Sequence, residues 1–162
     1  YFAQTHAHPE FESKTLLEIL WEMYSLQLGP AKGVLRKYEI DKQAEQKFSS
    51  LSGGQQARFQ VLLLEISGST LLLLDEPTTG LHFHDIKKLL KAINALVEQG
   101  DSVIIIEHNM EVIKCADHII ELGPTGGEQG GHLLFEGTPE EMVTAKNTET
   151  AQFLAEKLHP KR

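Results

Sequence analysis

Two adjacent carboxylates, Asp75 and Glu76, directly follow a run of four leucines at residues 71–74. The run is too short for a useful helix and is predicted to be a strand buried on both faces, which Pro77 ends. Acids at the carboxyl end of such a strand lie where α/β sheets bind ligands. Beside a phosphate, the first could hold Mg²⁺ through water and the second could orient or deprotonate an attacking water. A core strand followed by a solvated acidic turn would explain these residues equally well.

A second motif, Ser-Leu-Ser-Gly-Gly-Gln-Gln-Ala-Arg at residues 50–58, leads into an apolar stretch at 61–66. Ser52 is a good helix N-cap, and the paired Gly53 and Gly54 allow close backbone approach. The N–H groups at such a helix start are suited to a phosphate. Ser-Gly-Gly alone is common in loops, so the signal becomes specific only because the acidic strand follows at this distance.

Composition limits the class of protein. The 162 residues are enough for one domain, and the net charge of -8 argues against a general nucleic-acid-coating protein, although not against a DNA-binding parent whose basic face lies elsewhere. The single cysteine, Cys115, rules out a disulfide framework within the chain and any CxxC zinc site, so a reducing, cytoplasmic setting is expected. No apolar run approaches the length of a membrane span, and no signal segment opens the sequence. Because the chain begins at Tyr1 rather than Met, we expect a piece of a longer protein.

Hydrophobic periodicity and capping residues predict the elements that hold these motifs. Helices are expected at 15–26, ended by Gly29-Pro30, and at 31–38, 41–48 with Asp41 as N-cap, 85–98, 110–116, after Thr138-Pro139, and at 148–158. Further strands are expected at 102–106, 118–122 and 132–136. The glycine-rich segment 123–131 lacks the Gly-Lys-Ser/Thr end of a phosphate loop and is interpreted as a hairpin connection.

These motifs resemble those of the ATP-binding cassette (ABC) ATPases. Residues 51–55 are similar to the signature motif, 71–76 to the Walker B strand and 78–82 to the D-loop, and His108 matches the switch histidine. The resemblance implies an α/β class, partial P-loop NTPase (ABC cassette) fold. Its mostly parallel sheet would be flanked by helices, with a small helical signature subdomain.

The resemblance also implies an ATPase with ATP and Mg²⁺ as cofactors. Asp75 would lie on Mg²⁺, Glu76 would act as the base, and His108 would contact the γ-phosphate, where a neutral imidazole could sense that group. The residues that would contact ATP held by another cassette are Leu51, Ser52, Gly53, Gly54 and Gln55. A histidine after a core strand is otherwise a structural residue more often than a ligand.

The second half resembles one branch of the family, UvrA. The similar segments are 79–86, 106–109, 122–124 with its glycine run, and 136–140, and the resemblance is dense from 51 to about 143. It implies that the intact protein is an excinuclease ATPase that recognises DNA damage in nucleotide excision repair, within the SOS response. The implied partners are a second ABC cassette, in cis or as a dimer, DNA held by other parts of the parent, and a UvrB-like protein.

The first fifty residues resemble compact cassettes instead, including the ABC-F translation factors. UvrA carries a Cys-based zinc module between its P-loop and signature, and this sequence has none. Residues 1–4 are similar to the start of a Q-loop, whose glutamine, Gln4, would contact nucleotide and metal; a loop glutamine is equally compatible. A UvrA-like repair ATPase is therefore predicted, with an ABC-F-like or transporter-type engine, or a catalytically inert assembly lobe, as alternatives.

The 162 residues contain no Gly-x-x-x-x-Gly-Lys-Ser/Thr phosphate loop, so this chain alone is predicted to be inactive. The expected divisions are a Q-loop remnant with the helical signature subdomain at 1–58, the ATPase core at 59–145, and a C-terminal helix and tail at 146–162. A missing P-loop strand next to Walker B would leave an unpaired apolar edge, which predicts marginal stability or self-association.

Overall fold

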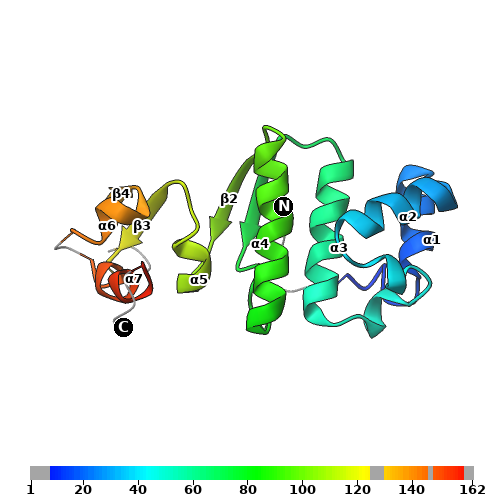
Figure 1. The fold of residues 1–162 in the computed structure, drawn as a ribbon, viewed down its shortest axis with the longest axis horizontal. Helices are drawn as coiled ribbons and strands as arrows, with labels where there is room; N and C mark the ends of the chain where they lie inside the picture. The colour runs from blue at the N-terminus through cyan, green and yellow to red at the C-terminus, as the bar shows by residue number, and fades with distance from the viewer. Residues whose placement is uncertain (1–7, 125–129, 146–147, 159–162) are drawn as a thin grey trace. The chain divides into compact units, whose positions relative to one another are not determined.

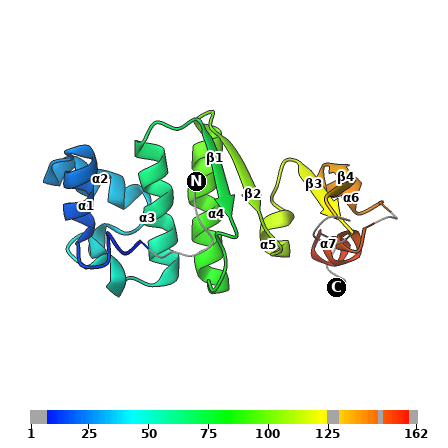
Figure 2. The same ribbon diagram turned by 180° about the vertical axis from the view of Figure 1, so that it is seen from behind.

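The structure, a computed structural model, describes residues 8–124, 130–145 and 148–158 (Figures 1 and 2). The chain divides into two compact units, residues 1–106 and 107–162, each with its own buried core. The first unit contains, in order, α1 (Leu16–Tyr24), α2 (Leu28–Lys37), the 3₁₀ turns η1 (Asp41–Gln43) and η2 (Phe48–Ser50), α3 (Gly53–Ile66), β1 (Leu71–Asp75), α4 (Phe83–Glu98) and β2 (Ser102–Ile106). This division at residue 106 is defined by the contacts within each unit. The domain boundaries at 58 and 145, which were predicted from the sequence motifs, stay predictions.

The first two helices begin and end for local reasons. Thr15 caps α1 through a capping box, in which its hydroxyl accepts the Glu18 N–H at 3.2 Å and the Glu18 carboxylate accepts the Thr15 N–H at 2.7 Å. The helix ends where Ser25 takes the left-handed conformation, with φ of 54°. The prediction that Gly29-Pro30 ends α1 was wrong, because both residues lie in the first turn of α2, where a proline needs no N–H partner.

The segment after α2 forms two short 3₁₀ turns, so the helix predicted at 41–48 was wrong. Its backbone groups are used in tertiary hydrogen bonds instead. The Ala44 carbonyl accepts the Leu17 N–H at 3.1 Å, and Lys47 forms an isolated antiparallel bridge with Thr15. These contacts tie the segment to the start of α1 and leave fewer groups for a helical ladder.

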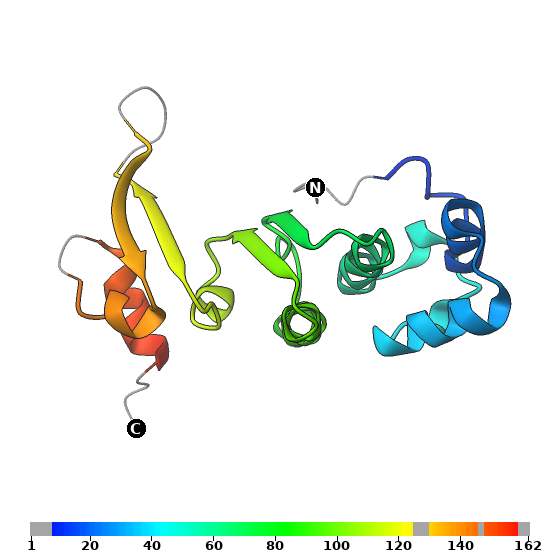
Figure 3. The same ribbon diagram turned by 90° about the horizontal axis from the view of Figure 1, so that it is seen from above.

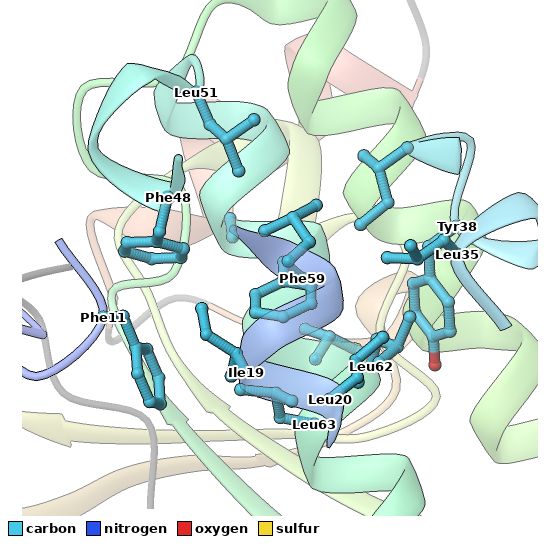
Figure 4. Packing of buried hydrophobic residues seen from close by; sticks show 14 of the residues in the cluster. Phe11, Ile19, Leu20, Leu35, Tyr38, Phe48, Leu51, Phe59, Leu62 and Leu63 are labelled. Atoms are coloured by element: carbon cyan, nitrogen blue, oxygen red, sulfur yellow. The ribbon is translucent and has the colours of Figure 1, made fainter. Parts of the chain in front are cut away.

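Helix α3 is the centre of the first core. Every residue from Ala57 to Leu63 is buried, so the helix is covered all round rather than along one stripe. Phe59 is 0% exposed, and its ring centroid lies 6.0 Å from that of Phe48. Figure 4 shows Phe59 among side chains that include Ile19. The helix that carries the signature motif is therefore fixed by packing.

Strands β1 and β2 are parallel neighbours, with Leu73 opposite Ile104. Figure 3 shows α4 along one face of the pair, and Leu72 and Leu74 are buried in the core that α4 shares. Leu71, Ile104 and Ile106 are 61%, 53% and 47% exposed. Alternate side chains of a strand point to opposite faces, and α4 covers only the face that carries Leu72 and Leu74. The prediction of strands buried on both faces was therefore wrong for the other face.

We expect the 162-residue chain to self-associate through this strand pair. Within the described residues, neither strand pairs with a third, and an unpaired edge beside exposed apolar side chains favours association. Sedimentation velocity should show concentration-dependent association that Ile104→Lys reduces, whereas Leu28→Lys, at a similarly exposed site on α2, should not reduce it. A monodisperse, cooperatively melting monomer at every concentration would contradict this expectation.

The Glu65 carboxylate joins the end of α2 to α3. It accepts the Tyr38 hydroxyl at 2.6 Å and pairs with Lys37. Partial burial raises the pKa of Glu65, but the hydrogen bonds from Lys37 and Tyr38 outweigh burial, and the pKa is lowered overall. A carboxyl group whose pKa is lower in the folded state stabilises the fold above its unfolded pKa, and this stabilisation is lost as the pH falls through its folded pKa.

Glu65→Gln is therefore expected to destabilise the chain at pH 7 by about 0.5–1 kcal/mol, because solvent screens this partly exposed pair. The effect should shrink once the pH falls well below the ordinary value of 4.5. Chemical denaturation of both proteins at neutral and acidic pH measures the difference. The control is Glu98→Gln at an exposed site on α4. An equal effect of Glu65→Gln at both pH values would refute the assignment.

The second unit contains α5 (Met110–Ile113), β3 (Ile119–Gly123), β4 (His132–Gly137), α6 (Pro139–Met142) and α7 (Thr150–Leu158). Strands β3 and β4 are antiparallel, so the predicted hairpin pairing is confirmed, while its connection at 125–129 lies outside the described residues. Thr138 caps α6 with Pro139 at its start, as predicted. None of the described helices is long and apolar enough to cross a membrane.

Helix α5 is shorter than the predicted 110–116. After Ile113 the chain continues in tight turns, in which the Cys115 N–H donates to the Val112 carbonyl at 2.9 Å and the Ala116 N–H to the Ile113 carbonyl at 3.2 Å. Bonds of this three-residue spacing tighten a helix end without extending the α-helix.

Candidate functional site

The two carboxylates lie at the carboxyl edge of the parallel strand pair. Asp75 ends β1, and the Glu76 N–H donates to the Ile106 carbonyl at 2.9 Å, which extends the pairing by one bond. Glu76 has a φ of 44°, in the left-handed region that non-glycine residues seldom adopt. Such a conformation persists only where the surroundings impose it, and it is frequent at functional sites. Both side chains are half-buried, so neither carboxylate is sealed in the core.

The turn after Glu76 folds back onto it. The Thr79 N–H donates to the Glu76 carbonyl at 3.1 Å, and the Thr79 hydroxyl donates to the Glu76 carboxylate at 3.0 Å. Gly80 has a φ of 73°, and the Leu81 N–H donates to the Thr78 carbonyl at 3.0 Å. The segment that resembles a D-loop therefore fixes both the backbone and the side chain of Glu76.

The signature segment begins α3 at the predicted N-cap. The Ser52 hydroxyl accepts the Gln55 N–H at 3.3 Å, and the Gln55 side-chain oxygen accepts the Ser52 N–H at 2.9 Å. Ser52 and Gly53 are exposed, whereas Leu51 is buried in the core. The first N–H groups of a helix have no acceptor within it, so this exposed start fits an anion such as a phosphate.

The space beside the Gly54 Cα atom, where a side chain would begin, is filled by another residue of the protein. A Cβ atom at this position would lie 2.4 Å from Asp85 Cγ and 2.5 Å from both Asp85 Cβ and Oδ1. A Cβ at Gly53 would lie 3.2 Å from Leu81 Cδ2. From the sequence, Gly53 and Gly54 are explained by the close approach of a bound phosphate to the backbone. The structure adds a second reason, because the start of α3 packs closely against residues 81–85.

Arg58 is a buried charge that sequence reasoning left without a role. It is 3% exposed, its Nε donates to the Tyr38 carbonyl at 3.0 Å, and its Nη1 lies 3.5 Å from Asp85 Oδ1. A charged side chain within a buried helix needs a polar or charged partner, and this requirement is the sequence signal from which a structural role for Arg58 could have been predicted. The partner could not be identified from sequence, since Asp85 is 27 residues further along the chain.

The predicted switch residue, His108, belongs to the second unit, where its side chain is exposed. The Glu107 carboxylate accepts the His108 N–H at 3.0 Å and the Asn109 N–H at 3.1 Å. Asn109 caps α5 by accepting the Glu111 N–H at 2.9 Å. The segment is therefore a hydrogen-bonded turn that presents the imidazole, while the role of His108 at a γ-phosphate stays a prediction.

The predicted metal contacts are Asp75 and Gln4, and Gln4 lies outside the described residues. The described ranges contain no group of three His, Cys, Asp or Glu side chains able to hold a metal. Mg²⁺ commonly binds through one or two carboxylates together with water and substrate phosphates. A single half-buried carboxylate at a sheet edge, as Asp75 provides, fits that mode of binding.

A cavity of about 520 Å³ lies elsewhere in the first unit, between the end of α2 and α4. Lys37, Lys88 and Lys91 are among its lining residues. Glu39 pairs with Lys88 at 3.3 Å and with Lys91 at 3.1 Å, and Glu65 pairs with Lys37. None of the predicted nucleotide-site residues Asp75, Glu76 and Ser52 lines this cavity, so we assign it no nucleotide-binding role.

A family model described as ABC transporter matches residues 4–79. Over 120 residues, the chain is 54% identical to UvrABC system protein A of Methanothermobacter thermautotrophicus, an alignment that covers 72% of this chain and 12% of that protein. The chain belongs to the ABC-type ATPases, in the UvrA branch. The crystal structure of UvrA2 from Deinococcus radiodurans is also similar, over 93% of this chain and 19% of that chain, with a TM-score of 0.69 and 31% identity.

The fold of this ABC-type chain also matches a nucleotide-free ATP-binding cassette from an ABC transporter. The TM-score is 0.71 at 14% identity, over 94% of this chain and 67% of that one, which supports the fold alone. The predicted partial ABC-cassette fold is confirmed, with a helical signature region before a parallel strand pair. The chain spans 12% of the length of the curated UvrA relatives that it matches.

Proposed function

We propose that this chain is part of an ATPase that couples ATP binding and hydrolysis to damage recognition in UvrA-like nucleotide excision repair. The observation that carries the proposal is the turn at Glu76, where a strained backbone and the Thr79 hydroxyl hold a carboxylate just after Asp75 at the end of a parallel strand. Identity of 54% to a UvrA protein supports the repair branch. The transporter cassette, at 14% identity, supports the fold alone.

Each predicted site residue has a role in this proposal. Bound Mg²⁺-ATP supplies the phosphoryl group that is transferred to water. Asp75 holds the metal, with Gln4 as the Q-loop contact, and Glu76 orients the attacking water and accepts its proton. His108 contacts the γ-phosphate. The exposed start of α3, which includes Ser52 and Gly53, binds ATP held by a second cassette.

The partners of the intact protein follow from the same proposal. A second ABC cassette, in cis or in a dimer, supplies the phosphate loop opposite the signature motif. Other parts of the parent contact DNA, and a UvrB-like protein receives the damaged site. Closure of two cassettes around ATP would then couple nucleotide binding to movement of the attached DNA-binding parts.

ATP turnover of the intact protein tests the proposal. We expect hydrolysis that a lesion-bearing duplex changes more than an undamaged duplex does, and no hydrolysis by the 162-residue chain alone. A response only to ribosomes or to a permease would favour an ABC-F-like or transporter-type engine. No turnover by the intact protein would favour a catalytically inert assembly lobe.

A further inference from the structure

We propose that Asp85 is a positioning residue that ties the ATP-facing start of α3 to the segment after the Walker B strand. This inference rests on the proposed function, because it concerns how the signature motif is held. Asp85 lies in the first turn of α4, nine residues beyond Glu76 and within one compact unit with the signature motif. Its side chain lies against α3 at two positions, Gly54 and Arg58.

The first contact is steric. Asp85 occupies the space beside Gly54, where any Cβ would lie 2.4–2.5 Å from three Asp85 atoms. One of these atoms is Asp85 Cβ, which cannot rotate away from its own backbone. A larger residue at position 54 must therefore displace either α3 or α4. Gly54 is thus required by the neighbouring helix, whatever a nucleotide also requires.

The second contact is electrostatic, about one helical turn along α3. Arg58 is 3% exposed and its guanidinium lies 3.5 Å from the Asp85 carboxylate. The Tyr38 carbonyl accepts the Nε of the same guanidinium at 3.0 Å. The start of α3 is therefore held by a close approach at Gly54 and, one turn further along, by a partly buried charge pair at Arg58, and Asp85 supplies both contacts.

The consequence is a mechanical connection between two nucleotide sites. The Walker B residues Asp75 and Glu76 act on the ATP of their own cassette, whereas the signature motif acts on ATP bound by the partner cassette. The turn from Glu76 to Leu81 is closed by hydrogen bonds and leads directly into α4. A displacement of this turn is therefore transmitted through Asp85 to the first turn of α3.

A mutational cycle at positions 54 and 85 tests the steric contact. In the intact protein, Gly54→Ala should raise the KM for ATP about tenfold or more, because the ATP-facing turn is displaced. In the Asp85→Gly background the same change should have less than a twofold effect, since all three clashing atoms are gone. Gly33→Ala on α2, where a Cβ has no neighbour within 4 Å, is the control and should leave the KM unchanged. An equal effect of Gly54→Ala in both backgrounds would overturn the proposal, because the glycine would then serve only the ligand.

Asp85→Asn tests the charge pair with little change in shape. It should raise the KM for ATP about fivefold and change kcat by less than twofold, whereas Asp117→Asn, at an exposed position of the second unit, should change neither. A purely structural defect removes active protein, which lowers kcat without altering the KM. A fall in kcat with an unchanged KM would therefore overturn the positioning role.

The two proposals fail in distinguishable ways. If the wild-type intact protein does not hydrolyse ATP, the proposed function fails. The contact can still be measured in thermal unfolding of the 162-residue chain, where the changes at positions 54 and 85 should be non-additive because the residues touch. Additive effects on unfolding would overturn the contact itself.

Discussion

Glu76→Gln is expected to leave ATP binding intact while it lowers ATP turnover of the intact protein by about 10²–10⁴-fold. Glutamine has the size of glutamate and can still accept the Thr79 hydroxyl bond that the carboxylate accepts at 3.0 Å. It cannot accept a proton from the attacking water at neutral pH. The expected state is therefore a closed pair of cassettes that retains ATP. Steady-state turnover and retention of radiolabelled ATP after rapid desalting measure the two effects.

The matched control for this change is Glu98→Gln, at an exposed position in the last turn of α4. It makes the same chemical substitution in the same unit and should retain parental turnover. Hydrolysis by the Glu76→Gln protein at the parental rate would show that Glu76 is not the base.

Phe59→Ala should lower the free energy of unfolding of the 162-residue chain by about 3–5 kcal/mol. Phe59 is fully buried in α3, and its ring packs against Phe48 within the core that joins the helical region to the strand pair (Figure 4). Its removal leaves a cavity that a helix covered on all sides cannot close by collapse. Chemical denaturation at a protein concentration below the onset of self-association measures the loss.

Phe153→Ala provides the control for this large-to-small change. Phe153 lies on α7 and is 59% exposed, so its truncation should change the free energy of unfolding by about 0.5 kcal/mol or less. Equal losses from the two substitutions would contradict the central place of α3 in the first core.

Elements whose ends are set by local chemistry could be predicted from sequence. Ser52 and Thr138 cap helices where expected, because their hydroxyls satisfy N–H groups three residues ahead. The strand ending at Asp75 and the long helix after it are also present where the hydrophobic pattern indicates them. In contrast, residues 41–48 were predicted as a helix from local pattern, but they form hydrogen bonds with the distant residues Lys14 and Leu17 instead.

The candidate site was predictable to the same extent. Asp75, Glu76 and Ser52 occupy a strand end and a helix start, and both positions follow from local pattern. The pairing of Arg58 with Asp85 and the close approach at Gly54 depend on how α3 packs against α4, which no local pattern encodes. The left-handed conformation of Glu76 was likewise not predictable, because glutamate has no intrinsic preference for it.

The most direct test of the repair assignment is fluorescence anisotropy of a lesion-bearing duplex and an undamaged duplex, titrated with the intact protein with and without ATP. The salt concentration must be held constant, because the affinity of proteins for DNA depends steeply on it. The proposed function predicts a preference for the damaged duplex that depends on ATP. Equal binding to both duplexes, or to neither, with and without ATP would contradict it.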